Sequence, residues 1–291
     1  MTVQRHIRSL LPQRIPTAHK GQCGRVGILA GSDMMPGAAL LATKAAFRSG
    51  AGLVYLAAPS SVLHIALSQI PEAIGIPITE DTLNNANILF EASQQYAWDS
   101  FIIGPGLGKH SDLTPYTTLI RRLYNEGICS VIDADALPLA SHAFESPNMA
   151  ILTPHEGEFS RLFGPIQDRT KAALAASIST QQTLVLKGKN TVIATHSGYS
   201  LNPTGNANMA TAGSGDVLSG IIGGLWAQYP AEHRAAASWD VAALAVWLHG
   251  TAGDLASREY QRGLMASDIT NALGDAFRHI EEQTLTYTHV R

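Results

Sequence analysis

The sequence predicts a single α/β domain over residues 1–291, in which helices cover both faces of a central, mostly parallel sheet. Three observations predict this fold class. Short apolar runs alternate with longer helical patterns, most of these runs are continuously apolar, and residues 216–280 contain helical patterns alone. A strand that is apolar on both faces is typical of a parallel sheet covered by helices on both sides.

Eight apolar runs are the predicted strands. They are residues 25–31, 53–58, 100–104, 129–135, 150–153, 183–188, 191–196 and 198–202. Only Ser197 separates the last two, which predicts a hairpin. Helical spacing predicts helices over 37–50, 112–127 and 168–182, followed by packed helices through 216–280 that include 239–256.

Composition and charge exclude several classes of protein. The formal net charge is −3 and there is no basic stripe, so we expect no nucleic-acid partner. No apolar run is long enough for a membrane helix, and the N-terminal residues lack the apolar core of a secretory signal. The two cysteines, Cys23 and Cys129, favour a reducing compartment. We therefore expect a cytoplasmic protein without a membrane partner.

Glycine clusters follow several predicted strands. The segments are LAGSDMMPGAA, GPGLG and KGKNT, and ligands of open parallel sheets bind at the carboxyl ends of strands. None of the three matches a Walker loop or the G-x-G-x-x-G fingerprint. The pattern indicates a ligand that contacts the backbone closely, and it argues against an ordinary P-loop enzyme or dehydrogenase.

The segment NMATAGSGDVLSG, residues 208–220, places Gly213, Gly215 and Asp216 at the start of a predicted helix. Helix N-terminal amides attract anions, and glycines let a phosphate approach the backbone. One interpretation is therefore a phosphate cradle in which Asp216 is a catalytic base. The other is that Asp216 is an acidic residue that stabilises the helix N-terminus and has no catalytic role.

Several segments of the sequence together resemble those of a known family. TAGSGD resembles the G-x-G-D signature of the ribokinase-like superfamily, and the chain more narrowly resembles the ADP-dependent (S)-NAD(P)H-hydrate dehydratases. The resemblance covers about residues 19–275. Its blocks, in the order of the family, are residues 19–32, 36–54, 102–108, 131–137, 153–162, 185–193 and 202–225.

This resemblance implies a ribokinase-like fold and the repair of hydrated nicotinamide cofactors, NADHX and NADPHX. ADP, or ATP in some members, phosphorylates the ring hydroxyl, and loss of that phosphate restores NAD(P)H. The implied catalytic base is Asp216. The implied substrate-binding residues are Ala39, Gly106, His155 and Asp216, and the implied nucleotide-binding residues are Lys187, Gly188, Lys189, Asn190, Thr191, Gly213 and Gly215.

The segment TPHEGEF is similar to a magnesium motif of related kinases, with His155 in place of an asparagine. This similarity implies that Glu158 acts on Mg²⁺ through water. The alternatives for His155 are a zinc site or a structural histidine; Phe159 stands where H-E-x-x-H needs its second histidine. Asp133 and Asp135 are candidates either for positioning metal or substrate, or for capping a turn. The family commonly has proline at the position of Glu156.

The family often carries an N-terminal epimerase domain, and we expect this chain to act without it, on the S epimer alone. One alternative function is a kinase of the same fold for a vitamin alcohol such as hydroxyethylthiazole. Another is a catalytically silent nucleotide sensor or scaffold, which the carboxylate of Asp216 argues against. The apolar helices of the C-terminal third suit a homo-oligomer, a tetramer being one such form.

Overall fold

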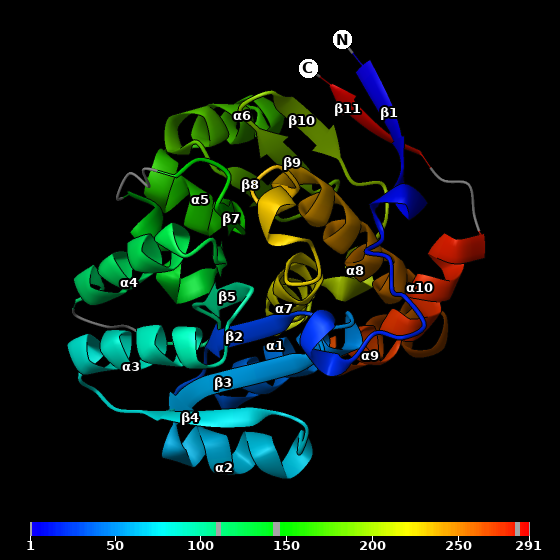
Figure 1. Cartoon of the computed structure of the whole chain (residues 1–291). Coiled ribbons are helices and arrows are strands. Elements are labelled where there is room, and N and C mark those ends of the chain that lie inside the picture. The colour runs from blue at the N-terminus through cyan, green and yellow to red at the C-terminus, as the bar shows by residue number, and fades with distance from the viewer. Residues whose placement is uncertain (1, 109–111, 142–145, 283–285, 291) are drawn as a thin grey trace.

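The computed structural model describes residues 2–108, 112–141, 146–282 and 286–290. The described strands form one eleven-stranded sheet in the order β1-β11-β10-β9-β8-β7-β6-β5-β2-β3-β4 (Figure 1). The predicted fold class, a mostly parallel sheet with helices on both faces, is confirmed.

The centre of the sheet is parallel, and its strands from β5 to β8 are buried at every position, as their continuous apolar runs require. The parallel strands are β2 (Arg25–Leu29), β3 (Leu53–Pro59), β4 (Ile74–Ile78), β5 (Ser100–Ile103), β6 (Cys129–Ile132), β7 (Ala150–Leu152) and β8 (Thr183–Leu186).

Antiparallel strands extend the sheet beyond β8. They are β9 (Val192–Thr195), β10 (Gly198–Leu201), β11 (Thr286–Val290) and β1 (Thr2–His6). The hairpin of β9 and β10 confirms the prediction.

The sequence did not predict β4, β1 or β11. Strand β4 is the sheet edge, where Pro77 is tolerated and Ile74 is exposed, so it lacks the apolar run of a central strand. Strands β1 and β11 are short and largely polar, and they pair with each other from opposite ends of the chain.

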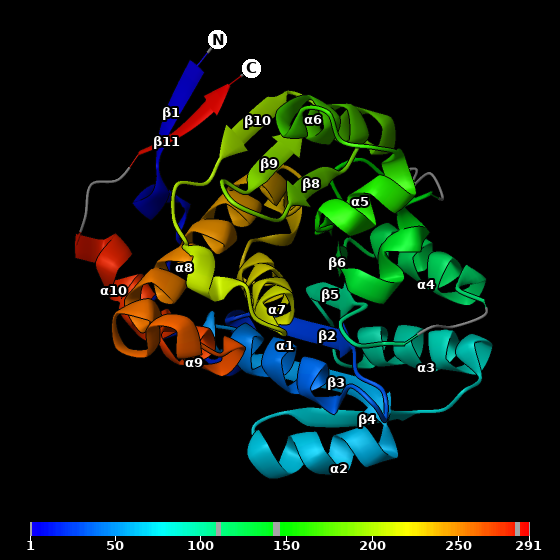
Figure 2. The same ribbon diagram turned by 180° about the vertical axis from the view of Figure 1, so that it is seen from behind.

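Helices cover both faces (Figures 1 and 2). One face carries α1 (Pro36–Arg48), α2 (Ser60–Gln69), α7 (Ser214–Trp226) and α8 (Ser238–Tyr260), with α9 (Ala266–Asn271) and α10 (Leu273–Glu282) beside them. The other face carries α3 (Thr82–Gln95), α4 (Thr114–Asn125), α5 (Glu156–Phe163) and α6 (Arg169–Thr180). The helices predicted at 37–50, 112–127, 168–182 and 239–256 are all present.

Three glycines of α7 let this helix pack directly against its neighbours. A Cβ at Gly220 would lie 2.3 Å from the carbonyl oxygen of Ala42, and one at Gly224 would lie 2.6 Å from that of Ala46, both in α1. A Cβ at Gly223 would lie 2.5 Å from Ile102 of β5. Close packing on both sides therefore fixes where the N-terminus of α7 lies.

The helices of the C-terminal third bury most of their apolar residues within the chain. Of the large apolar side chains described there, Tyr260 and Met265 are exposed. The C-terminal helices therefore expose no broad apolar surface that would support an oligomer, and the homo-oligomer stays a prediction. Cys23 and Cys129 are unpaired. No described helix is both long and apolar enough to cross a membrane.

Candidate active site

The candidate site lies along the carboxyl edge of the parallel strands. The loops after β8, β7, β6, β5 and β2 follow one another there in the order of the strands. The chain leaves β2 toward β3 and leaves β5 toward β6, so the strand order reverses between β2 and β5. Ligands of open α/β sheets bind outside such a point of reversal. The N-terminus of α7 faces the same edge and brings Gly213–Asp216 to it (Figure 2).

Gly213 caps α7 in a conformation that favours glycine. Its φ is +86°, and a Cβ there would lie 2.4 Å from Cδ1 of Leu41. The N–H of Val217 donates to the carbonyl of Gly213 at 3.1 Å and closes the first turn. The N–H groups of Gly215 and Asp216 belong to that turn, where amides have no intrahelical acceptor, so they can bind an anion.

Asp216 is the third residue of α7, within the first turn as predicted. Burial raises the pKa of its carboxyl to about 7, and the negative charge of Asp133 raises it further while Lys187 opposes the rise. A carboxyl with a pKa near 7 is suited to accept a proton at neutral pH.

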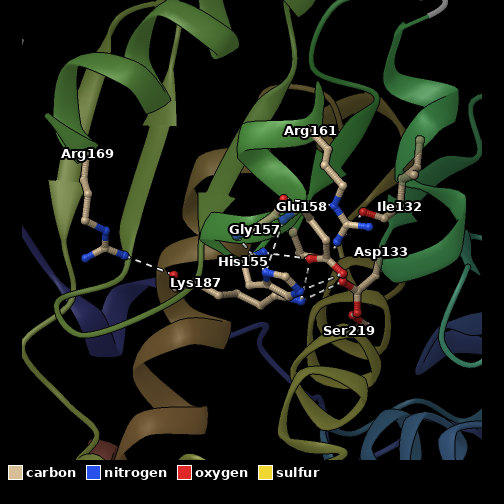
Figure 3. A network of polar contacts seen from close by, with 10 residues as sticks. Ile132, Asp133, His155, Gly157, Glu158, Arg161, Arg169, Lys187 and Ser219 are labelled. Carbon is tan, nitrogen blue, oxygen red and sulfur yellow. Dashed lines mark hydrogen bonds and ion pairs between the residues drawn. The ribbon is translucent and has the colours of Figure 1, made fainter. Parts of the chain in front are cut away.

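Lys187 and Asp133 form an ion pair beside this carboxyl. The Nζ of Lys187 donates to Oδ1 of Asp133 at 2.8 Å, and Oγ of Ser219 donates to Oδ2 at 2.6 Å (Figure 3). Asp133 is only 1% exposed. Burial alone would lower the pKa of Lys187, but the negative charges of Asp133 and Glu158 raise it overall, so the ammonium remains charged.

The ammonium of Lys187 also lies next to the α7 amides, because a Cβ at Gly215 would lie 3.2 Å from its Nζ. The structure thus brings together Lys187 and Gly215, two predicted nucleotide-binding residues, with Asp216. A fixed cation and helix amides together are suited to hold a phosphate.

His155 and Glu158 cap α5. The N–H of His155 donates to Oε2 of Glu158 at 2.8 Å, and Nδ1 of His155 accepts from the N–H groups of Gly157 at 3.0 Å and Glu158 at 3.2 Å (Figure 3). This arrangement matches the structural-histidine alternative. The carboxylate of Glu158 nevertheless lies 3.9 Å from Nζ of Lys187, so it belongs to the same charged cluster.

The other two predicted substrate residues lie at the β2 and β5 loops. Gly106 has φ +59°, and a Cβ there would lie 2.6 Å from Cβ of Ala38. Ala39 is fully buried, and its Cβ would lie 2.8 Å from one added at Gly31. Both positions need small residues because the two loops pack closely. Because all of Ala39 is buried, its role here is to pack rather than to present an exposed atom to a ligand.

Asp135 caps a turn, since its Oδ2 accepts from the N–H of Gly108 at 2.9 Å. Of the two carboxylates that follow β6, only Asp133 pairs with Lys187, although the negative charge of Asp135 also raises the pKa of Asp216. Within the described ranges, no group of three or more His, Cys, Asp or Glu residues is placed to hold a metal ion.

The loop after β8 carries the remaining predicted nucleotide residues. Gly188 has φ +136° and Asn190 has φ +53°, Lys189 is exposed, and Oγ1 of Thr191 donates to the carbonyl of Gly188 at 2.9 Å. The loop therefore turns away from the sheet edge at Gly188, while the side chain of Lys187 points inward.

Sequence reasoning missed Arg169, the first residue of α6. Its guanidinium donates to the carbonyls of Leu186 at 3.2 Å and Lys187 at 3.1 Å, and to that of Lys189. Its Nε lies 3.0 Å from Oε1 of Glu156, the position where the family commonly has proline. One signal was present: the helix dipole disfavours a cation in the first turn, so an arginine there needs another reason.

A second missed residue is His249 of α8. Its Nε2 lies 3.2 Å from Oγ of Ser214, the residue between the two glycines at the start of α7. Burial lowers the pKa of His249 to about 4, so the imidazole is neutral at physiological pH. The sequence neighbours of Ser214 carry no sign of a partner in α8.

Comparisons with known proteins identify the family of this chain. A family model described as NAD(P)H-hydrate dehydratase matches residues 26–274. The chain is 34% identical over 291 residues to the ADP-dependent (S)-NAD(P)H-hydrate dehydratase of Bacillus subtilis, covering 96% of this chain and 98% of that protein. It is 39% identical over 293 residues to the bifunctional NAD(P)H-hydrate repair enzyme Nnr of Moorella thermoacetica. That match covers 96% of this chain but 54% of the relative, so the chain spans about half the length of such bifunctional relatives.

Solved structures give the same result. A crystal structure of the ADP/ATP-dependent NAD(P)H-hydrate dehydratase of Bacillus subtilis, co-crystallized with ATP/Mg²⁺, is similar with a TM-score of 0.80 and 32% identity. The similarity covers 94% of this chain and 96% of that one. A hydroxyethylthiazole kinase from Pyrococcus horikoshii has a TM-score of 0.60 at 14% identity, which is a likeness of fold alone.

Proposed function

The chain belongs to the NAD(P)H-hydrate dehydratase family, and from this we propose that it dehydrates the S epimer of NAD(P)H hydrate at the expense of ADP. The observation that carries the proposal is the cluster at the N-terminus of α7, where a carboxyl with a pKa near 7 lies beside free helix amides and a partly buried ammonium. The two unpaired cysteines support a cytoplasmic setting.

Asp216 is the proposed base. Its carboxylate takes the proton of the ring hydroxyl as that oxygen attacks the terminal phosphorus of ADP, and AMP leaves. The phosphorylated carbon then loses phosphate, and the neighbouring carbon loses a proton, so the ring double bond forms again. The first step converts a hydroxyl, a poor leaving group, into phosphate, a better one.

The charged groups around Asp216 stabilise the transferred phosphoryl group. The amides of Gly215 and Asp216 and the ammonium of Lys187 can offset the charge that develops on its oxygens. Lys189, Asn190 and Thr191 lie on the loop that follows Lys187, and we propose that this loop borders the adenosine. We propose that Gly106 and the backbone near Ala39 hold the hydrate on the other side of Asp216.

The residues present fit a magnesium ion held mainly by phosphate. Glu158 offers one partly exposed carboxylate, while that of Asp133 is already bound by Lys187 and Ser219. Mg²⁺ keeps several waters and binds through few protein carboxylates plus substrate phosphates. Glu158 would hold the ion through water, and the ion would neutralise phosphate charge.

The test is recovery of reduced-nicotinamide absorbance from chemically prepared NADH hydrate, with Mg²⁺ and either ADP or ATP. Asp216→Asn should slow recovery by a factor of roughly 10²–10⁴. Asp81→Asn is the matched control, because it removes a carboxylate from a helix N-cap at the far edge of the sheet and asparagine caps equally well. Absence of recovery with folded wild-type protein would contradict the proposal, and a panel of vitamin alcohols would then test the kinase alternative.

A further inference from the structure

The loop 187–191 is held from outside by Arg169. Two of its residues, Gly188 and Asn190, have positive φ, and such conformations persist only where the surroundings impose them. Apart from Arg169, Oγ1 of Thr191 donates to the Gly188 carbonyl at 2.9 Å, and the two ends of the loop are hydrogen-bonded to other segments. There the Lys187 N–H donates to the Pro154 carbonyl and the Thr191 carbonyl accepts from the Asn202 N–H, both at 2.9 Å. The guanidinium of Arg169 supplies three more, to the carbonyls on either side of the turn.

The guanidinium also packs against Gly188. A Cβ there would lie 2.8 Å from Nη2 of Arg169, so glycine is required both by φ and by this contact. Figure 3 shows Arg169 approaching the carbonyl of Lys187 from the side opposite to Asp133. Lys187 is thus fixed at both ends: its backbone by Arg169 and its Nζ by Asp133.

Glu156 lies beside Arg169. Its Oε1 is 3.0 Å from Nε of Arg169, an ion pair without hydrogen-bond geometry, while the two Nη atoms face the loop. Glu156 is 60% exposed, and an ion pair so exposed adds little to stability. The ion pair therefore matters for the orientation of the Arg169 guanidinium rather than for stability. Because Glu156 begins α5, the pair also connects the loop to the helix that carries Glu158.

We propose that Arg169 is the positioning residue for the loop 187–191 and that Glu156 orients Arg169 there, so that nucleotide affinity depends on this pair. Neither side chain needs to touch the nucleotide. The inference rests on the proposed function in one respect, which is that nucleotide binding is assigned there to this loop.

The experiment compares Arg169→Gln, Glu156→Gln and the double variant with wild type. The matched control is Lys171→Gln, which removes an 86% exposed cation from the same helix. Arg169→Gln should raise the Kd and KM for ADP about tenfold and leave the KM for the hydrate within about twofold. Glu156→Gln should raise the same constants about threefold, and the double variant should match Arg169→Gln because the two residues act in series.

Hydrogen exchange of the ligand-free proteins separates this inference from the proposed function. Amides 187–191 should exchange faster in both single variants than in wild type or Lys171→Gln, whether or not the protein binds ADP. Unchanged exchange, or equal increases in the KM for ADP and for the hydrate, would overturn the inference. Wild-type protein that binds no ADP, with faster exchange in the variants, would overturn the proposed function and leave the positioning of the loop supported.

Discussion

The ammonium of Lys187 lies 2.8 Å from the carboxylate of Asp133, and both stand next to Asp216 at the start of α7. The three residues come from the ends of β8 and β6 and from a helix far along the chain. Lys187 neutralises Asp133 and also faces the amides of α7. The same cation therefore contacts the buried carboxylate and the turn at which we propose that phosphate binds.

Asp216→Asn should lower kcat by a factor of roughly 10²–10⁴, because general-base catalysis supplies about that much. Asparagine keeps the size of the side chain but cannot accept the proton. Binding of ADP, measured by calorimetry, should change little, since the helix amides remain. A variant with more than a tenth of wild-type kcat would show that another group is the base.

The pH profile of kcat/KM should rise with pH through about 7, because the pKa of Asp216 in the free enzyme is raised to that value and only the carboxylate accepts a proton. Lys187→Met should move this inflection to higher pH, since Lys187 is the nearby charge that lowers the pKa of Asp216. An inflection that moves to lower pH in Lys187→Met would contradict this electrostatic assignment.

Asp216→Asn should also stabilise the fold above neutral pH. The pKa of Asp216 is raised on folding, so its contribution to stability is present below about 4 and is lost as pH rises through about 7. Asparagine carries no such loss. The gain in unfolding free energy of Asp216→Asn over wild type, followed by Tm, should therefore be small at pH 4 and grow until about pH 7. It should reach about 4 kcal/mol, because the pKa is raised from 3.8 to about 7 and each pKa unit is worth about 1.4 kcal/mol. A gain that shrinks as pH rises would have the wrong sign.

Gly213→Ala should destabilise the protein by about 2 kcal/mol or more, because it combines an unfavourable φ with a clash against Leu41. Gly127→Ala is the matched control: Gly127 has φ +74° but no atom within 4 Å of an added Cβ, so it should show the strain alone. Urea denaturation of both variants measures the difference. Equal losses would mean that the contact with Leu41 relaxes freely.

The sequence predicted the parallel core and the start of α7 because both depend on local patterns. Continuous apolar runs indicate buried strands, and a G-x-G-D segment before a helical pattern indicates the glycine cap at which the helix begins. Partners that meet only in the folded chain carry no such signal. In the sequence, Arg169 is an ordinary helix residue, and only the fold shows that it contacts the loop after β8. Ser219 is likewise one small residue of an apolar helix, and only the fold shows that it donates to Asp133.

The sequence could not distinguish the roles of Asp133 and Asp135 for the same reason: their partners meet them only in the folded chain. Asp133 and Asp135 stand two residues apart, and both were candidates for the same role. Burial separates them: one lies under Lys187 and Ser219, and the other caps the turn at Gly108. Spacing alone could not decide between them, because both follow the same strand.

The glycines of α7 make the position of Asp216, the proposed base, depend on the interior of the protein. Gly224 lies eight residues beyond Asp216, about 12 Å along the helix, yet a methyl group there would push α7 off α1 and tilt its first turn. A saturation-mutagenesis scan would therefore find inactivating substitutions in two groups: one around the charged cluster, and one at Gly220, Gly223 and Gly224, which are buried against α1 and β5. Enzymologists screening variants of this protein would mistake the second group for folding defects unless they measured Tm and kcat together.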